Sequence, residues 1–251
     1  MNRKVYIHEE VSIRGAARAR YMHHVTAWWS PVGRAERGQL CLGVFGTVGS
    51  TGRWPEVINI WEEDGFAGLA RSFEHELSHP DLQDPSLRAW WRQAAPLRRG
   101  GFDRILLPAP WSPTVEELLA RGVRGAVYTQ EIVAVEPGLA EAMLEDFREH
   151  ALPALREAAG AALVGAFRNA LVADSECVLL CALPSFAAWG ELEEARRRPG
   201  AIRDGLARGY RRARDYRRTL LVEAPLSPLR LGRQPEATDR RPLDEVDGAG
   251  S

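Results

Sequence analysis

An internal repeat is the feature that most constrains the fold of this 251-residue chain. The segment 127–131 (VYTQE) repeats the segment 5–9 (VYIHE) after 122 positions, and 163–167 (LVGAF) repeats 41–45 (CLGVF) at the same offset. Two further segments, 176–186 and 221–228, echo 56–66 and 106–113 with small changes in spacing. Because all four matches keep their order along the chain, we interpret the sequence as an internal duplication.

The same order of secondary structure is predicted for both copies. Period-two alternation predicts strands at 4–13, 40–48, 56–62 and 102–107, and again at 126–135, 162–172, 176–183 and 218–223. Helical spacing predicts helices at 16–38, 66–77 and 86–97, and again at 139–159, 185–197 and 202–216. The resulting order is β-α-β-β-α-α-β. Antiparallel strands crossed by helices on one side are typical of a ferredoxin-like unit.

The bare face of each sheet needs a cover. Residues 177–183 are apolar on both faces of their strand, so the sister sheet is the simplest partner. We therefore predict an α+β fold in which two tandem ferredoxin-like units form an intrachain dimeric α/β barrel. The predicted boundaries are a first unit at 1–113, a linker helix at 114–124, a second unit at 125–228 and a disordered tail at 229–251. The tail is polar and rich in Pro, Gly and Asp.

Composition excludes several partners. The net charge is −1, which gives no general attraction to nucleic acid or anionic lipid. The sequence has no signal-type leader and no stretch approaching the roughly 20 apolar residues of a membrane helix. We therefore expect a cytoplasmic protein with neither a membrane nor a nucleic-acid partner. Cys41, Cys177 and Cys181 fall within apolar strands and lack the spacing of a redox or zinc motif, so we expect buried thiols.

Short motifs in both copies resemble a known family. Val127-Tyr128 with Glu131, then Pro137-Gly138 and later Gly165-Ala166-Phe167, look like the opening of a NIPSNAP-type domain. The segment 57–62 (VINIWE) resembles the third strand of that family. The chain is thus similar to a tandem member of the dimeric α/β barrel superfamily over residues 3–228. The first copy departs from the pattern, because His8 stands before Glu9 and Arg14-Gly15 replaces Pro-Gly.

The resemblance implies a range of chemistries. The superfamily includes cofactor-free monooxygenases, polyketide cyclases, lactone isomerases and haem-degrading or haem peroxidase relatives. A function inferred from such a list is an analogy between folds, so the choice among these activities must be argued from the residues of this chain.

Differences between the copies select the candidate residues. Positions shared by both copies, such as Glu9 and Glu131, are interpreted as structural. His8 stands opposite Gln130 in the alignment of the copies, and Asn59 stands opposite Leu179. We predict that Tyr6, His8, Asn59 and Trp61 form one polar and aromatic patch on neighbouring strands, where His8 acts as general acid or base. In that arrangement Tyr6 and Asn59 would orient a substrate oxygen.

Other side chains complete the predicted site. Glu62 or His79 would assist catalysis, and His79 precedes a proline at a place where a histidine helps to close the pocket in related barrel enzymes. Tryptophan is concentrated in the first copy, and such bias indicates an aromatic pocket. The predicted substrate-binding residues are Trp61, Trp28, Trp90 and His24. His75 and His79 have the spacing of zinc ligands but lack a third ligand, so no metal is predicted.

These features predict an enzyme of bacterial specialised metabolism. It would act without a cofactor on an apolar or aromatic small molecule, by cyclisation, isomerisation, dehydration or cofactor-free oxygenation. Two alternatives stay open: a non-catalytic binding protein for haem or another hydrophobic ligand, and a structural interaction protein. A homodimer is a possible partner arrangement, because tandem barrels often associate further.

Overall fold

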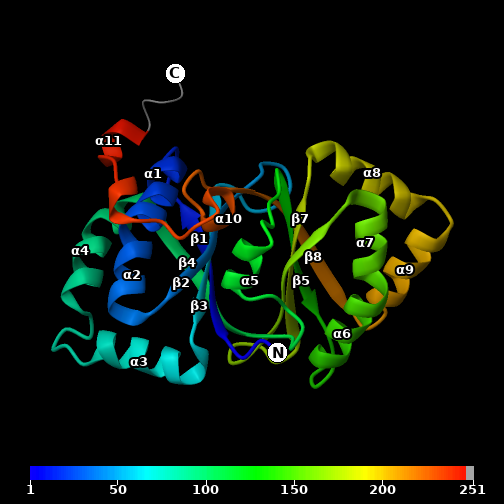
Figure 1. Cartoon of the computed structure of the whole chain (residues 1–251), viewed down its shortest axis with the longest axis horizontal. Helices are drawn as coiled ribbons and strands as arrows, with labels where there is room; N and C mark the ends of the chain where they lie inside the picture. The colour runs from blue at the N-terminus through cyan, green and yellow to red at the C-terminus, as the bar shows by residue number, and fades with distance from the viewer. Residues whose placement is uncertain (247–251) are drawn as a thin grey trace. The chain divides into compact units, whose positions relative to one another are not determined.

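The chain divides into two compact units in the computed structural model, which describes residues 1–246 (Figure 1). The N-terminal unit comprises Arg3–Asp103 and the described part of the segment that starts at Glu223. The central unit comprises Met1–Asn2 and Arg104–Val222. The division falls inside strand β4 (Arg98–Pro108), whereas the sequence predicted the first boundary at residue 113.

The N-terminal unit has an antiparallel sheet in the order β1-β3-β2. Its elements in chain order are β1 (Val5–Ile13), α1 (Arg18–His23), a π-helical turn η1 (His24–Trp29), α2 (Ser30–Arg37), β2 (Leu40–Thr47), β3 (Glu56–Glu63), α3 (Gly65–Leu77), α4 (Pro85–Ala94) and a 3-10 turn η2 (Ala95–Leu97), followed by the start of β4. The helices α2, α3 and α4 lie on one side of these strands (Figure 1). The strands match the predicted ranges closely, and the predicted helix at 16–38 is interrupted by the π-helical turn.

The central unit has the antiparallel order β8-β5-β7-β6-β4. Its elements are the end of β4, α5 (Val115–Ala120), β5 (Val127–Ala134), α6 (Ala140–Asp146), a π-helical turn η3 (Phe147–Ala151), α7 (Leu152–Ala159), β6 (Ala162–Asn169), β7 (Glu176–Leu183), α8 (Phe186–Arg197), α9 (Ala201–Gly209) and β8 (Asp215–Glu223). The antiparallel α+β prediction is confirmed. The closure of the two units into one intrachain barrel stays a prediction.

The repeated glycines at the start of the second strand in each unit have a steric role. Both strands carry a β-bulge, between Cys41 and Gly43 in β2 and between Leu163 and Gly165 in β6. A Cβ atom on Gly43 would lie 2.4 Å from the ring of Phe45, and one on Gly165 would lie 2.2 Å from the ring of Phe167. The Gly-x-Phe repeat therefore exists because the aromatic ring folds back over the glycine two residues earlier.

The C-terminal segment differs from the prediction of disorder. It forms α10 (Pro228–Leu231), a 3-10 turn η4 (Ala237–Asp239) and α11 (Leu243–Val246). The Gln234 side chain accepts a hydrogen bond from the Cys41 amide at 3.0 Å and donates one to the Cys41 carbonyl at 2.7 Å. Arg240 lies over the Trp28 ring at 4.7 Å. Specific contacts thus order a segment whose composition is typical of disorder, and the rest of the predicted tail, 247–251, lies outside the described residues.

Burial follows the expected pattern. All three cysteines are buried free thiols, as predicted, and burial raises the pKa of the Cys177 and Cys181 thiols to about 12. Within residues 1–246, no helix has both the length and the apolar character that a bilayer crossing requires.

Alanine substitutions at glycines test the steric role of the bulge. Gly165→Ala should destabilise the protein by about 1–3 kcal/mol, because the new methyl group forces the Phe167 ring out of its site. Gly190→Ala is the matched control, since a Cβ added to Gly190 in α8 would meet no packed neighbour within 4 Å, and it should stabilise by up to about 1 kcal/mol. Urea unfolding midpoints measure both effects. Equal midpoints for the two variants would contradict the steric explanation.

Candidate functional site

A pocket of about 240 Å³ lies between the sheet of the N-terminal unit and the helices that cover it. Its floor consists of side chains from β1 and β3, and its walls come from η1, α3 and α4. The lining residues are Ile7, Glu9, Val25, Trp29, Arg37, Gln39, Asn59, Trp61, Ser72, Phe73, Glu76, Leu87, Trp90, Trp91, Arg98 and Asp103. The volume is near the lower end of ligand pockets, which span roughly 300–1,000 Å³, so a molecule of a few rings is the largest that fits.

A glutamate on the floor is held by two neutral donors. Asn59 Nδ2 donates to Glu9 Oε2 at 2.8 Å, and Trp61 Nε1 donates to the same oxygen at 3.0 Å. The antiparallel register creates this contact, because Glu9 pairs directly with Asn59 across β1 and β3 and therefore shares its face. Both bonds go to Oε2, so Oε1 is the oxygen available for a proton. Asn59 Nδ2 also lies 3.2 Å from the hydroxyl of Tyr21.

The pKa of the Glu9 carboxyl is raised above its usual value, chiefly because burial penalises the charged form. The Asp103 charge raises it further, while the bonds from Trp61 and Asn59 and the Arg98 charge oppose the shift. Glu9 is half-buried, and its side chain faces the pocket. A carboxyl with a raised pKa inside a pocket is suited to proton transfer near neutral pH.

The aromatic wall is fixed by reciprocal contacts. His24 and Trp90 stack with ring centroids 5.2 Å apart, His24 Nε2 lies 3.1 Å from the Trp90 carbonyl, and Trp90 Nε1 donates to the His24 carbonyl at 3.3 Å. Trp90 also packs edge-on against Trp91 at 5.3 Å. Trp29 Nε1 donates to Gln39 at 3.3 Å. These contacts hold the indole rings in place, so the apolar surface of the pocket is preformed.

The structure places the predicted site residues in several different positions. Asn59, Trp61 and Trp90 line the pocket, as expected. The predicted patch that joins Tyr6 and His8 with Asn59 and Trp61 is wrong. In the observed register His8 pairs with Ile60 and Tyr6 pairs with Glu62, so they occupy the sheet face opposite to Asn59.

On that other face, Tyr6 donates to Glu62 Oε2 at 2.7 Å, and both side chains are buried. His8 is fully buried there as well. None of the three lines the pocket that contains Glu9. Alternation along β1 separates neighbouring side chains onto opposite faces, and only the pairing with β3 shows which residues meet.

Three further predicted residues lie outside the pocket lining. His24 contributes indirectly, because it supports Trp90 from behind. Trp28 lies under the guanidinium of Arg240 from the C-terminal segment, so it does not contact a ligand in this pocket. His79 packs edge-on against His75, with ring centroids 6.1 Å apart, at the C-terminal end of α3.

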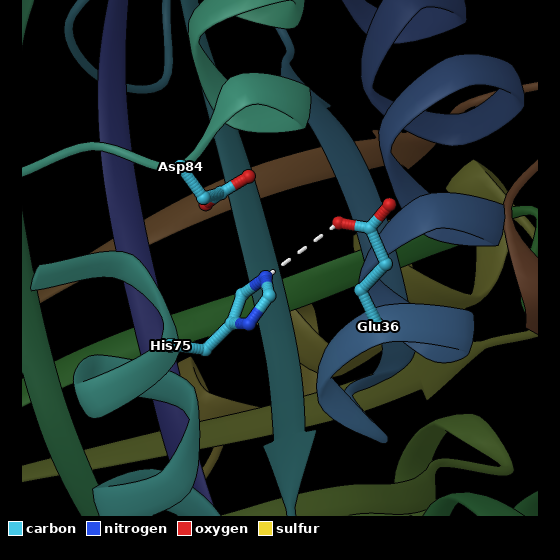
Figure 2. A group of neighbouring side chains, drawn as sticks. All are labelled: Glu36, His75 and Asp84. Carbon is cyan, nitrogen blue, oxygen red and sulfur yellow. Dashed lines mark ion pairs between the residues drawn. The ribbon is translucent and has the colours of Figure 1, made fainter. Parts of the chain in front are cut away.

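A histidine and two carboxylates approach one another between α2, α3 and α4 (Figure 2). His75 Nε2 lies 3.8 Å from Glu36 Oε2, and Asp84 stands nearby at the start of α4. Asp84 already accepts a bond from the Leu87 amide at 2.9 Å and forms an ion pair with Arg37. Because the Arg37 guanidinium already neutralises Asp84, and Glu36 accepts a hydrogen bond from Ser86 at 2.8 Å, the cluster is a poor fit for a metal ion.

The equivalent glutamate of the central unit is neutralised. Glu131 occupies the position in β5 that Glu9 occupies in β1, but its cross-strand partner is Leu179 instead of asparagine. Arg218 Nε contacts Glu131 Oε1 at 2.5 Å, and the Tyr210 hydroxyl donates to Oε2 at 2.5 Å. An arginine and a phenol therefore fill the place beside this carboxylate, and Glu131 is bound as a structural ion pair.

Sequence reasoning missed Glu9 and Arg98 as residues that line the pocket. Glu9 was interpreted as structural because Glu131 matches it in the other copy. The difference between its cross-strand neighbours and those of Glu131 could have identified Glu9. Asn59 and Trp61 stand at the positions that Leu179 and Cys181 occupy in the second copy, so β3 offers neutral N–H donors to Glu9 and β7 offers none to Glu131.

Comparisons with known proteins found likeness only in solved structures. No family model matches the chain, and no curated protein matches it. A "putative monooxygenase" from Lactobacillus acidophilus is 10% identical with a TM-score of 0.58, covering 89% of this chain and 95% of its own. An anthrone oxidase-like protein is also 10% identical, with a TM-score of 0.56 and coverage of 88% and 92%.

A NIPSNAP family protein from Agrobacterium tumefaciens is 23% identical but covers only 44% of this chain, with 97% of its own length and a TM-score of 0.36. The likeness shows the fold alone. The structures that resemble this chain include NIPSNAP proteins, and membership of this chain in that family stays a prediction.

The raised pKa of Glu9 predicts how stability depends on pH. The folded state binds the carboxyl proton of Glu9 more tightly than the unfolded chain does. The free energy of unfolding therefore decreases as the pH rises from about 4.5 through the pKa of Glu9 in the folded state. Glu9→Gln does not titrate, so its stability relative to the wild type should increase between pH 4 and pH 7. Unfolding midpoints in urea at both pH values measure this change.

Glu131→Gln is the matched control, since it changes the equivalent position of the central unit. It should lose up to about 3 kcal/mol at pH 7, because the largely buried Arg218 loses its close carboxylate partner and keeps only the longer contact with Glu193 at 3.7 Å. If Glu9→Gln became relatively less stable on going from pH 4 to pH 7, burial of the Glu9 charge would not be the dominant effect.

Proposed function

We propose that the protein is a cofactor-independent enzyme that uses Glu9 as a general base on an aromatic small molecule in the pocket of the N-terminal unit. The observation that carries this proposal is the buried carboxylate with a raised pKa, held through one oxygen by Asn59 and Trp61. The hydrogen bonds fix the orientation of the carboxylate and direct Oε1 to the substrate. Removal of a proton by such a positioned base contributes about 10²–10⁴-fold to rate.

The reaction begins with proton abstraction from an acidic C–H or O–H bond. Glu9 Oε1 accepts the proton and becomes a neutral carboxylic acid, which burial favours. The substrate keeps the electron pair as a carbanion, enolate or phenolate stabilised by its own ring. The indole rings of Trp29, Trp61, Trp90 and Trp91 hold the planar ring and exclude water.

Oxygenation is the follow-on step that we favour over cyclisation, isomerisation or dehydration. Two neighbours with the same fold carry the names monooxygenase and anthrone oxidase-like protein, and this supports the choice by analogy between folds. An anthrone CH₂ group would lose a proton to Glu9, react with O₂ and become a carbonyl group with release of water. The central unit, where Arg218 neutralises Glu131, would serve as scaffold.

Turnover by two variants tests the assignment of the base. Anthrone is incubated with the protein in air, and O₂ uptake and anthraquinone absorbance are followed. Glu9→Gln should reduce kcat at least about a hundredfold, as for loss of a general base. His8→Gln should change kcat less than tenfold, because His8 lies on the opposite face of β1. Loss of activity in His8→Gln alone would assign the base to the other face.

The pH profile provides a second readout of the same proposal. Since Glu9 must be ionised to act as a base, kcat/KM should rise with pH through an apparent pKa above the usual 4.5 of a glutamate. This rise should be absent from the residual activity of Glu9→Gln. A profile that falls over the same range would indicate that the protonated form is active and would contradict a base role.

A further inference from the structure

One cation of the pocket forms no direct ion pair with the described residues. Arg98 begins β4, and its guanidinium carbon lies 4.8 Å from the centre of the Trp91 ring. Both side chains line the pocket that contains Glu9. Within residues 1–246 the Arg98 side chain forms no ion pair, and its backbone carbonyl accepts a bond from Arg14 at 3.0 Å. Arg98 acts on Glu9 through its charge without a direct bond, so its guanidinium N–H groups are available to a ligand.

The other arginine of the pocket is already neutralised. Arg37 forms ion pairs with Glu76, at 3.0 Å, and with Asp84. Its charge therefore serves to join α2 with α3 and with the start of α4. The guanidinium of Arg98 can therefore bind an anionic oxygen of a ligand. The Trp91 ring beside it offers an aromatic face on which a planar ligand can stack.

A second polar atom in the pocket also lacks a partner in the described part of the chain. Asn59 is 1% exposed, and its Nδ2 is bonded to Glu9 and Tyr21, but its Oδ1 accepts no hydrogen bond from residues 1–246. A buried carbonyl oxygen without a donor destabilises the structure, and a ligand hydroxyl that donates to it removes that penalty. Glu9 fixes the orientation of the amide, because its carboxylate requires the NH₂ group as donor.

We propose that the ligand of this pocket is a hydroxylated aromatic acid. Its ring stacks among the indole rings, its carboxylate binds Arg98, and its hydroxyl donates to Asn59 Oδ1. This assignment deepens the proposed function and rests on it, since it names the substrate class of the same pocket. Arg98 and Asn59 recognise two different substituents, so the two groups together define which aromatic molecules bind.

Three commercially available probes separate these contributions. 6-Hydroxy-2-naphthoate carries both groups at opposite ends of the ring system, 6-hydroxy-2-naphthamide lacks the negative charge, and 2-naphthoate lacks the hydroxyl. Isothermal titration calorimetry with the full chain should give the tightest binding for the first probe. The amide should bind at least about tenfold more weakly, because a charge-assisted bond is lost. The deoxy probe should also bind at least about tenfold more weakly, because Asn59 Oδ1 stays without a donor.

Variants assign the charge preference to one residue. Arg98→Gln should bind the acid and the amide equally, and Arg98→Lys should keep part of the preference. Arg92→Gln removes the same charge from an exposed position on α4 outside the pocket lining, so it should keep the full preference. Thermal unfolding of each variant confirms that it is folded. Equal binding of acid and amide by the wild type, or the same loss in Arg92→Gln as in Arg98→Gln, would overturn the proposal.

Failure of this inference can be distinguished from failure of the proposed function. Glu9→Gln should bind 6-hydroxy-2-naphthoate at least as tightly as the wild type, since a nearby negative charge is removed, while it loses turnover. If the probes show no preference but turnover still depends on Glu9, only the substrate class is wrong. If the preference holds and Glu9→Gln keeps full turnover, the pocket binds aromatic acids and the general base lies elsewhere.

Discussion

The site depends on the pairing of one glutamate with one asparagine across two neighbouring strands. The register that sets Glu9 opposite Asn59 brings two N–H donors to a buried carboxylate without bringing a cation into contact with it. A cation in direct contact would stabilise the charged form and lower the pKa, as arginine does for carboxylates elsewhere in proteins. Neutral donors instead orient the group while burial keeps its pKa high, and that combination makes the carboxyl suitable for proton transfer.

The two copies show how the same scaffold position can serve either chemistry or stability. In β5 the equivalent carboxylate of Glu131 contacts Arg218 and Tyr210, so its oxygens are occupied. The helix packing differs in the same way. The π-helical turn η1 ends with Trp29 beside the pocket, whereas η3 ends with Ala151. Gly209 packs so closely against Ala151 that a Cβ added to Gly209 would lie 2.3 Å from the Ala151 Cβ. Small residues close this region in the central unit, and tryptophans surround an open pocket in the N-terminal unit.

Part of the site could be predicted from the sequence, and the error in the rest has a definite cause. Tryptophan bias towards the first copy indicated an aromatic pocket, and Trp61 and Trp90 line the pocket of the N-terminal unit. Asn59 was found because Leu179 replaces it in the other copy. His8 was preferred over Glu9 because its residue type differs between the copies, whereas a shared residue was assumed to be structural. Conserved identity within a repeat does not imply equal environment, since the partners of Glu9 and Glu131 come from other strands.

The sequence by itself determined the local structure: the strands, the amphipathic helices, the duplicated order and the glycine bulges. These features follow from period, turn chemistry and steric size, which act between residues close in the chain. Only the tertiary structure decided which face of β1 meets which face of β3, which carboxylate is left without an arginine, and that the polar C-terminal segment is bound to β2. Each of these depends on contacts between residues far apart in sequence, and a one-residue shift of register would reverse them.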